Sequence, residues 1–470
     1  MIYATSGATC SSTGTIAPPS RSRDSVLRGT AGDSRWTSAP AGTRSRIGPS
    51  AAPAMIVTRC PAAIHSAARR SAVASVPPAL KSWRRMAIDF KVTGTLLTAA
   101  GMKVAIFLPS LAGGGAERIA LFVTERLRAA GIDAQLVVAK AEGALADAPV
   151  FASHGVDLKA PNEMLSARAL LRYVDRERPD LVFAFVHSAK MMAGIVKKWR
   201  PDIRLAISVH NALEVPRRAR FWPRALFGHA PERWLYRDVM AAHAVSRDLA
   251  AQVVRQFALP PERVHTIYNP LPDRPVANAI EAAHAPFFAR PVIVNAGRMV
   301  PQKDQAALIR AFHAAGLAGR ATLLILGEGP LRPALEAQIR DLGIADSVKM
   351  PGFVADVRPY MARAAGFVLS SRNEGFGLVL AEALSMGCPV AAFDCPSGPR
   401  ELLADGRLGE LIAAGDESRL AQAMVRMADG TAQRPSRAAV EAHLRQFAPD
   451  TIADQYVALV RSLAPGRALA

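Results

Sequence analysis

From residue 102 onwards, short apolar runs alternate with longer segments in which apolar residues recur every three or four positions. The runs predict strands at residues 103–108, 134–139, 181–186 and 205–209, and the longer spacing predicts a helix at 116–130. Short apolar runs bounded by turn residues indicate buried strands, and a period of 3.6 indicates an amphipathic helix. Alternating strands and helices favour a parallel sheet covered by helices.

The alternation breaks around residues 270–290, which are rich in proline and alanine, and then restarts. Such a composition is typical of a linker. The pattern beyond it predicts strands at 292–296, 322–326, 348–350, 366–369 and 390–393, and helices at 305–315, 331–342 and 378–386. We therefore expect an α/β fold with two Rossmann-like domains facing across a cleft, with ligands at the carboxyl ends of the strands.

The first hundred residues differ in composition from the rest. Residues 1–101 are rich in Ser, Arg, Ala and Pro and hold 13 Lys/Arg against three Asp/Glu, so about half of the formal net charge of +19 lies there. Such a stretch cannot bury enough apolar surface to offset its chain entropy. We expect a disordered low-complexity extension, or sequence upstream of a true start at Met102, which opens directly into the first strand.

These patterns predict the following organisation. The expected parts are an extension at 1–101, a first Rossmann-like domain at 102–275, a linker at 276–290, a second Rossmann-like domain at 291–440, and C-terminal helices at 441–470 that pack back towards the first domain. The chain after residue 101 is only moderately basic, which suits an anionic ligand or an anionic membrane surface better than nucleic acid.

The cysteine pattern and the hydropathy indicate the cellular compartment in which the protein is expected. The four cysteines form no C-x-x-C pair, so neither a disulfide framework nor a zinc site is expected, and a reducing cytoplasm fits best. No run of 18 apolar residues occurs, so no transmembrane helix is predicted.

Two loops that follow predicted strands could bind an anion. In "LAGGGAER", residues 111–118, three glycines let backbone amides approach an anion at a helix N-terminus, and Arg118 stands where a dinucleotide fingerprint needs glycine. In "NAGRMVPQKDQ", residues 295–305, Arg298 and Lys303 could clamp a diphosphate. The alternatives are a plain tight turn and two solvated cations.

Three more segments follow the same logic. "LGEGPLR" and "PGFVADV" are glycine turns after strands, and each alone is a weak signal. "SRNEGFGLVLAEALSMGCPV", residues 370–389, places Glu374 on a glycine loop before a helix from about Leu378, whose positive end would face a ligand. Glu382 lies in that helix between small residues, which leave room for a ligand such as ribose hydroxyls. An exposed place on an amphipathic helix is the alternative for Glu382.

In this order, these segments resemble the family 4 retaining glycosyltransferases, which have the two-domain GT-B fold. The resemblance covers about residues 102–465. It implies that the domain at 102–275 is the acceptor domain and that the domain at 291–440 is the nucleotide-sugar domain. Its most specific part is Glu374 and Glu382, separated by seven residues, within "NEGFGLVLAEALSMGCPV". "GGAER" and the pair Arg298 and Lys303 agree with it.

The resemblance implies a role for each matching residue. It implies that Arg298 and Lys303 hold the diphosphate of a nucleotide sugar, that Glu374 contacts the donor hexose, and that His187 completes the catalytic set. The donor-binding residues that it implies are Gly114, Gly115, Gly352, Phe353, Gly375, Phe376, Gly377, Leu378 and Glu382. The acceptor-side candidates are Glu117, Arg118 and His210.

The two histidines both follow predicted strands. His187, in "FAFVHSAK", lies where relatives often place an active-site histidine, and His210, in "SVHNAL", is the second candidate. Histidine can serve as donor, acceptor or cation, but a structural histidine with satisfied hydrogen bonds is the alternative for each.

The resemblance also implies the reaction. A hexose or N-acetylhexosamine would pass from a nucleotide sugar to an acceptor by front-face displacement, with retention. No D-x-D motif is present, so we expect no metal and no other cofactor, with cationic side chains and a helix N-terminus stabilising the departing diphosphate. "DCPSGPRELL", residues 394–403, favours UDP over GDP as the nucleotide of the donor, although Arg400 departs from the family pattern.

The acceptor is less well defined by the sequence. Residues 196–204 and 214–236 mix Lys and Arg with Trp, Phe and Leu, which suits peripheral contact with anionic lipid on the cytoplasmic face. A partly buried helical segment with a basic face is the alternative. We expect a cytoplasmic enzyme acting on a saccharide or lipid-linked acceptor in cell-envelope glycan synthesis. A sugar-nucleotide epimerase of the same fold, or a non-catalytic nucleotide-sugar-binding protein, remains the rival class.

Overall fold

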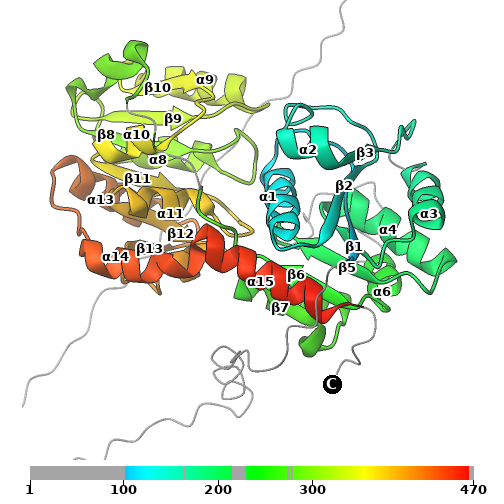
Figure 1. The fold of residues 1–470 in the computed structure, drawn as a ribbon. Coiled ribbons are helices and arrows are strands. Elements are labelled where there is room, and N and C mark those ends of the chain that lie inside the picture. Colours follow the sequence, from blue (N-terminus) through cyan, green and yellow to red (C-terminus); the bar gives the residue numbers. More distant parts are fainter. Residues whose placement is uncertain (1–100, 163–164, 214–228, 273–275, 277–278, 465–470) are drawn as a thin grey trace, which may run out of the picture. The chain divides into compact units, whose positions relative to one another are not determined.

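The computed structural model describes residues 101–162, 165–213, 229–272, 276 and 279–464. Residues 1–100 of the extension that was expected to be disordered lie outside these ranges. Residues 214–228 of the segment that was expected to contact lipid also lie outside them. Within them the chain forms two separate parallel sheets flanked by helices (Figure 1), which confirms the α/β fold with two Rossmann-like halves.

The first sheet has seven strands in the order β3-β2-β1-β4-β5-β6-β7, and all neighbours are parallel. Its strands are β1 (Lys103–Leu108), β2 (Asp133–Val138), β3 (Gly155–Asp157), β4 (Leu181–Ala184), β5 (Leu205–Val209), β6 (Ala241–Ala244) and β7 (Val264–Thr266). The helices between them are α1 (Gly115–Ala129), α2 (Pro149–His154), α3 (Ser166–Glu177), α4 (His187–Trp199), α6 (Ala230–Tyr236), α7 (Arg247–Phe257) and the short η2 (Pro261–Arg263). The strand order reverses between β1 and β4.

The second sheet has six parallel strands in the order β10-β9-β8-β11-β12-β13. They are β8 (Val292–Ala296), β9 (Thr322–Leu326), β10 (Val348–Gly352), β11 (Gly366–Leu369), β12 (Val390–Asp394) and β13 (Glu410–Ala413). The helices are η3 (Ala282–Ala289), α8 (Gln305–Ala314), α9 (Arg332–Asp341), α10 (Arg358–Arg363), α11 (Leu378–Ser385), α12 (Pro399–Leu402), α13 (Glu417–Ala428), α14 (Arg437–Leu444), η4 (Arg445–Phe447) and α15 (Pro449–Ser462). Here the order reverses between β8 and β11.

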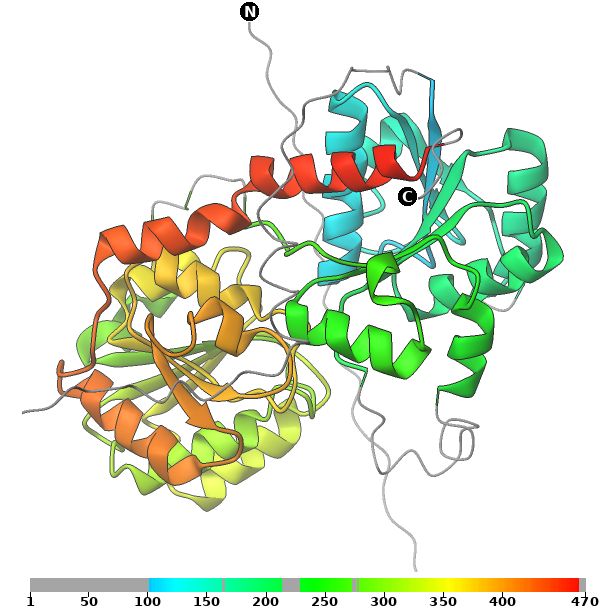
Figure 2. The ribbon, with the colours of Figure 1, turned by 90° about the horizontal axis from the view of Figure 1, so that it is seen from below.

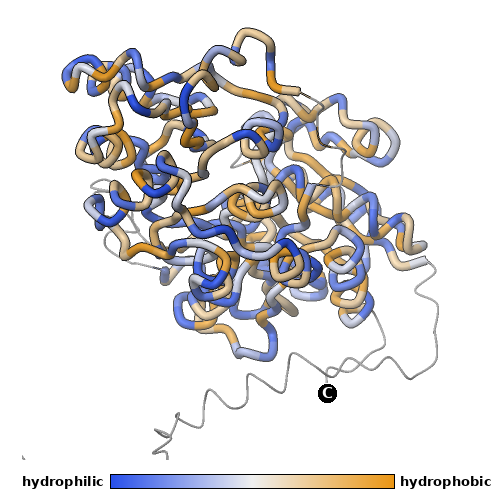
Figure 3. The backbone as a smooth tube through the Cα atoms, turned by 90° about the vertical axis from the view of Figure 1, so that its left-hand side faces the viewer, coloured by the Kyte–Doolittle hydropathy of each residue, from blue (hydrophilic) through white to orange (hydrophobic). Residues whose placement is uncertain are grey.

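Successive side chains of the second sheet enter different cores. Ile293 packs in a cluster with residues of α8, α9 and α13, whereas Val294 belongs to a second cluster that includes residues of α10 and α11. Strand side chains alternate between the two faces of a sheet, so an apolar residue at nearly every position requires helices on both. Figure 3 shows that hydrophilic and hydrophobic residues alternate along the helices, as expected for helices that pack one face on a sheet.

The C-terminal helix lies beside the first helix of the first sheet. Arg126 on α1 pairs with Asp450 on α15 at 3.0 Å, and the Arg461 guanidinium donates to the Ala130 carbonyl at 3.2 Å. Figure 2 shows α15 in red alongside α1 in cyan. The segment expected as a linker contains η3, whose His284 lies 2.7 Å from the Tyr360 hydroxyl, so this part of it packs against α10.

A second set of contacts joins α7 to α12. The Glu401 carboxylate accepts the backbone N–H groups of Arg247 and Asp248, both at 3.1 Å, and the Tyr268 hydroxyl at 2.8 Å. Burial raises the pKa of Glu401, while these donors oppose the rise. Because the contacts bridge elements of the two sheets, loops of both sheets meet here.

Candidate active site

Two oppositely charged side chains meet at the switch point of the second sheet. Lys303 follows β8 and Glu374 follows β11, the neighbouring strands between which the strand order reverses. The Lys303 ammonium lies 2.6 Å from Glu374 Oε1. Carboxyl-terminal loops at such a point are where open α/β sheets bind ligands. The structure therefore brings together two residues for which the sequence predicted catalytic roles.

Other groups fix the orientation of Glu374. The Ser371 hydroxyl donates to the same Oε1 at 2.6 Å, and the Glu374 backbone N–H donates to the Pro396 carbonyl at 3.1 Å. Only 6% of the Glu374 side chain is exposed. Its other oxygen, Oε2, has no hydrogen-bond partner among the described residues. One oxygen is thus committed to the protein, and the other is available to a ligand.

Arg298 supplies a second cation on the loop after β8. It is exposed, and among the described residues its guanidinium has no ion pair, while its carbonyl accepts from Gln305 Nε2 at 3.1 Å. Lys303 packs over Gly297, where an added Cβ would lie 3.4 Å from the lysine Cε. The loop therefore holds one cation that is paired with a carboxylate and one that is free to meet an anion.

The two loops are bonded to each other along their backbones. The Arg372 N–H donates to the Gln302 carbonyl at 2.8 Å, Gln302 Nε2 donates to the Asn373 carbonyl at 3.0 Å, and the Ser370 hydroxyl donates to the Lys303 carbonyl at 2.9 Å. These bonds leave little freedom for the charged residues that the loops carry. The site is therefore built before any ligand arrives.

Gly375 allows a loop of the first sheet to touch this site. A Cβ at Gly375 would lie 1.7 Å from the His210 carbonyl oxygen, so no other residue fits without a movement of one backbone. His210 follows β5. The structure thus brings His210 to the loop that carries Glu374.

The next residues begin helix α11. Gly377 is its N-cap with φ of +81°, a left-handed conformation that glycine adopts without strain, and Leu378 is the first helical residue. The Phe376 side chain is buried and stacks on Tyr268, with ring centroids 5.3 Å apart. Because its side chain is buried, Phe376 can offer a ligand only its backbone groups, whereas the Leu378 side chain is half-buried.

Glu382 lies on α11 and is half-buried. The pKa of the Arg358 guanidinium is raised mainly by its hydrogen bond to Asp356, and the charge of Glu382 adds to the rise. Arg358 itself is buried and bonds both oxygens of Asp356, at 2.9 and 2.8 Å. Sequence reasoning missed this arginine. Glu382 thus has a fixed cation in its surroundings rather than the open solvent of an exposed helix face.

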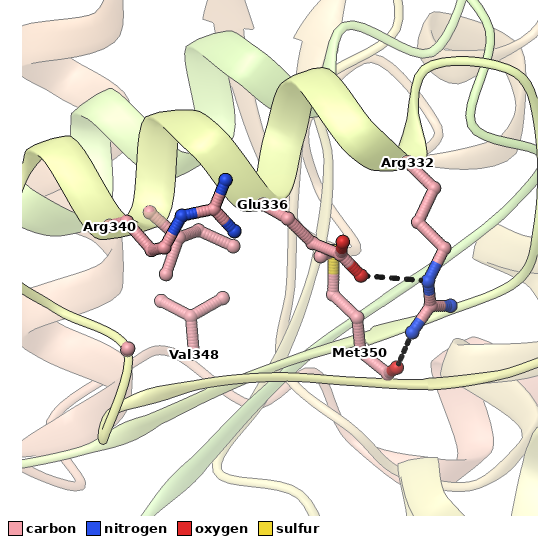
Figure 4. Close-up of a pocket in the computed structure, with 7 residues that line it drawn as sticks. Arg332, Glu336, Arg340, Val348 and Met350 are labelled. Atoms are coloured by element: carbon pink, nitrogen blue, oxygen red, sulfur yellow. Dashed lines mark hydrogen bonds and ion pairs between the residues drawn. The ribbon is translucent and has the colours of Figure 1, made fainter. Parts of the chain in front are cut away.

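The loop after β10 presents an aromatic ring. Phe353 is 70% exposed, and Gly352 precedes it with φ of +104°. The charged residues of the neighbouring "LGEGPLR" segment bond within the protein, since Arg332 donates to Glu328 at 2.6 Å and to the Met350 carbonyl at 2.6 Å. Figure 4 shows Arg332 at a pocket between α9 and β10, and none of the predicted site residues lines that pocket.

The glycine loop after β1 already faces a carboxylate. An added Cβ at Gly114, the N-cap of α1, would lie 2.4 Å from Glu117 Oε2, so the Glu117 side chain folds back over the helix N-terminus. The Arg118 guanidinium reaches the Gly113 carbonyl at 3.4 Å. Gly115, the first residue of α1, is exposed. An anion approaching Gly114 would have to displace or avoid Glu117.

The two candidate histidines have different surroundings. His187 is exposed at the first position of α4, after Val186 with φ of +65°. His210 is half-buried, its ring stacks on Phe185 with centroids 5.5 Å apart, and its Nε2 lies 2.8 Å from the Ser208 hydroxyl. The contact with Gly375 is made by His210. Ser208 was not recognised in the sequence, where a serine inside a strand carries no signal.

No group of three or more His, Cys, Asp or Glu residues in the described part of the chain could hold a metal ion. The described cysteines, Cys388 and Cys395, are free and buried, and burial raises the pKa of each thiol to about 12. The charge of Glu374 also raises the pKa of the Cys395 thiol, and the charge of Lys303 opposes that rise. A thiol with such a pKa stays protonated at neutral pH and is a poor nucleophile.

Two family models match the chain, one on each sheet. "Glycosyltransferase Family 4" matches residues 113–273, and "Glycosyl transferases group 1" matches residues 290–429. Their order and extent correspond to the two halves of the fold. The loops that carry Gly114, His187 and His210 fall in the first match, and those that carry Lys303 and Glu374 fall in the second.

Several curated relatives are named as glycosyltransferases, and one of them is named for lipopolysaccharide core biosynthesis. A Campylobacter jejuni enzyme named N-acetylgalactosamine-N,N'-diacetylbacillosaminyl-diphospho-undecaprenol 4-alpha-N-acetylgalactosaminyltransferase is 33% identical over 175 residues, 37% of this chain and 47% of the relative. The lipopolysaccharide core biosynthesis glycosyltransferase LpsD of Rhizobium meliloti is 28% identical over 273 residues, 57% of this chain and 77% of the relative. The chain thus aligns with about half the length of the first and three quarters of the second.

A solved structure shares the fold over the full length of its own chain. HepE from Anabaena, in complex with UDP-glucose, superposes with a TM-score of 0.61 at 20% identity, covering 77% of this chain and 100% of HepE. Together with the two family models, this likeness identifies the chain as a GT-B glycosyltransferase of the family 4 type.

Proposed function

We propose that the enzyme transfers a hexose or N-acetylhexosamine from a UDP-sugar to a saccharide or lipid-linked acceptor in cell-envelope glycan synthesis, with retention of configuration. The observation that carries this proposal is the Lys303–Glu374 pair at the switch point of the second sheet, with the exposed Arg298 on the same loop as Lys303. The names of the relatives support the acceptor class, and the UDP-glucose complex of a structural neighbour supports the donor class.

The cations act on the diphosphate. Arg298 meets it as a planar fork with several donors, and Lys303 as a point charge. Lys303 then shares its charge between Glu374 and the phosphate. As the bond from the sugar to the diphosphate breaks, negative charge grows on the leaving group, and fixed cations stabilise that charge without reorganising. These residues take the part that a divalent metal would otherwise have, so transfer is independent of added metal.

Carboxylates and an aromatic ring hold the rest of the donor. Glu374 accepts hydroxyl groups of the sugar at Oε2, because Oε1 is already bonded to Lys303 and Ser371. Glu382 accepts the ribose hydroxyls, with Arg358 compensating its charge. The exposed Phe353 ring borders the base. Glu374 Oε2 and the exposed Phe353 ring thus offer a ligand interactions that the described residues do not complete.

Retention is proposed from the resemblance to the family 4 retaining glycosyltransferases, and the residues of the site bear on how it would be achieved. A double displacement of the glycosidase type needs a carboxylate nucleophile and a second carboxylate roughly 5 Å away. Glu374 is held by Lys303 and Ser371 and serves better as a hydrogen-bond acceptor than as a nucleophile. The acceptor hydroxyl therefore enters on the face from which the diphosphate departs, and the departing phosphate takes its proton.

The acceptor side of the proposal includes contact with a membrane surface. Trp199 on α4 and Trp234 on α6 are 51% and 58% exposed, and the Lys198 ammonium lies 5.1 Å from the Trp234 ring centroid. Exposed tryptophans flanked by basic residues favour the lipid interface. None of the described helices is long and apolar enough to cross a bilayer.

A liposome assay tests the membrane contact. The Trp199→Ser/Trp234→Ser variant should lose co-sedimentation with anionic vesicles, whereas Leu165→Ser, which removes an exposed apolar side chain elsewhere, should retain it. Absence of vesicle binding by the unchanged protein would remove the membrane part of the proposal and leave the donor chemistry intact.

The decisive assay is a panel of UDP- and GDP-sugars with purified enzyme and undecaprenyl-diphosphate saccharides. We expect UDP release that depends on the acceptor, an α-linked product from an α-linked donor by NMR, and an unchanged rate in EDTA. Formation of an epimerised donor without UDP release, or an inverted product, would contradict the proposal.

A further inference from the structure

Four groups in the first sheet form an unbroken chain of hydrogen bonds that ends at the candidate active site. His210 Nε2 lies 2.8 Å from the Ser208 hydroxyl, which lies 2.6 Å from His243 Nδ1, and His243 Nε2 lies 2.7 Å from the Ile267 carbonyl oxygen. Ser208 is on β5 and His243 on β6, and both are fully buried. The described function does not by itself require this chain.

The direction of each bond can be assigned from its far end. The Ile267 carbonyl can only accept, so the Nε2 of His243 carries a hydrogen. Burial, with the nearby positive charges of Lys190 and His265, lowers the pKa of His243 to about 4, so its ring is neutral at pH 7 and Nδ1 is bare. The single hydrogen of Ser208 must then point to that nitrogen.

The same reasoning continues to His210. Since Ser208 donates to His243, its oxygen must accept from His210, whose Nε2 therefore carries a hydrogen. Burial is the largest cause that lowers the pKa of His210 well below its ordinary value, and repulsion by a protonated His243 and by Lys190 adds to the effect. A neutral ring protonated at Nε2 keeps a lone pair at Nδ1.

We propose that His243 is a positioning residue that acts through Ser208 to hold His210 in the Nε2–H tautomer, so that Nδ1 of His210 is a fixed hydrogen-bond acceptor for a substrate hydroxyl. The stacking of His210 on Phe185, with planes 28° apart, fixes the ring that carries this acceptor. The selection of a hydroxyl rests on the proposed function, because sugar hydroxyls donate whereas ionised phosphates cannot.

Two contacts connect this chain of hydrogen bonds to the rest of the molecule. The Tyr456 hydroxyl of α15 lies 3.3 Å from Nε2 and 3.5 Å from Nδ1 of His243, so it packs against the ring rather than replacing either bond. At the other end, the His210 carbonyl abuts Gly375, beside Glu374. The backbone of His210, whose ring carries the acceptor, is therefore adjacent to the loop that holds the donor sugar in the proposed complex.

The tautomer is measurable without any substrate. In protein labelled with ¹⁵N at its ten histidines, long-range ¹H–¹⁵N spectra at pH 7 should show His210 and His243 protonated at Nε2 and bare at Nδ1. His210→Gln and His243→Gln variants assign the signals. Ser208→Ala should leave His210 with averaged shifts of two exchanging tautomers, whereas Ser347→Ala, which removes a buried hydroxyl in the second half, should leave it unchanged.

Kinetics then separate this inference from the proposed function. Ser208→Ala and His243→Leu should each lower kcat about tenfold, the equivalent of one lost hydrogen bond. His243→Asn, which keeps an acceptor towards Ser208, should recover most of that loss. An Nδ1–H tautomer at His210, or unchanged His210 shifts in Ser208→Ala, would overturn the inference even if transfer is observed. If no nucleotide sugar is consumed by unchanged protein, the proposed function fails while the tautomer result still stands.

Discussion

The Lys303 ammonium lies 2.6 Å from the Glu374 carboxylate, although the two residues are 71 positions apart. The pair is mostly shielded from solvent, with 18% of the lysine side chain and 6% of the glutamate side chain exposed. A partly buried ion pair of this kind keeps both charges in place at a cost in desolvation. The pair lies at the reversal of strand order, where open α/β sheets bind ligands, and the proposed ligand there is the diphosphate of the donor.

Replacing Lys303 by Ala should lower kcat by about 100-fold or more, because one fixed cation on the leaving group is lost and the buried Glu374 charge is left uncompensated. Steady-state assays of UDP release measure the effect. Lys349→Ala, which removes a half-buried lysine that bonds only the Ala345 carbonyl among described residues, is the matched control and should retain full activity. Wild-type turnover in Lys303→Ala would remove the assigned role.

Replacing Glu382 by Ala should weaken the binding of UDP about tenfold to 100-fold, as expected for lost hydrogen bonds from hydroxyls to a charged group. Isothermal titration with UDP and 2′-deoxy-UDP gives a sharper test, since the variant should bind both alike. Glu336→Ala on α9 removes a carboxylate that pairs with Arg332 and should not alter UDP affinity. Equal loss of affinity in the two variants would speak against ribose recognition.

Replacing Gly375 by Ala should destabilise the protein by about 1–3 kcal/mol, because the added methyl group overlaps the His210 carbonyl and forces a shift. The shift should also reduce transfer. Gly316→Ala provides the comparison, since an added Cβ there meets open space and only the φ of +64° is unfavourable. Thermal unfolding with equal losses in both variants would show that the contact between Gly375 and His210 is not close in solution.

His243 should make stability depend on pH. Its pKa is lowered to about 4 in the folded protein, against about 6.5 in an unfolded chain. Between these values the unfolded state binds the proton and the folded state does not, so stability is present above pH 6.5 and is lost as the pH falls towards 4. The difference amounts to about 3 kcal/mol at pH 4.

Denaturant unfolding at several pH values tests this expectation. The wild type should lose about 3 kcal/mol more than His243→Gln between pH 7 and pH 4, since glutamine does not titrate. Lys190, His265 and His210 surround the ring and remain in the variant, so their contributions cancel to first order. Parallel pH profiles would show that His243 is not held neutral.

The strands that the sequence predicted are those with continuous apolar runs, such as residues 322–326, where helices cover both faces of the sheet. Strand β6 went unrecognised because its four residues, "AAHA", have little apolar bulk and include a histidine. Strands β3 and β7 have only three residues each, too few to show a period. β13, with four residues, was also not predicted.

The site was predictable to the level of its loops but not of its pairings. Glycine turns and charges after strands locate Lys303 and Glu374, because the chemistry of a parallel sheet concentrates at the ends of its strands. The sequence gives no sign that Ser371 bonds Glu374, that Arg358 lies near Glu382, or that Gly375 touches His210, since these contacts depend on tertiary packing. Ser208 and His243 are polar residues inside strands, and only their mutual distance shows that they act together.

The central claim is that Arg298 and Lys303 bind the diphosphate of the donor, and calorimetric affinities for UDP and UMP test it most directly. The wild type should bind UDP at least about tenfold more tightly than UMP, the equivalent of one charge-assisted hydrogen bond to the second phosphate. In the Arg298→Ala/Lys303→Ala variant the two affinities should become nearly equal. A double variant that keeps the full preference for UDP would contradict the account.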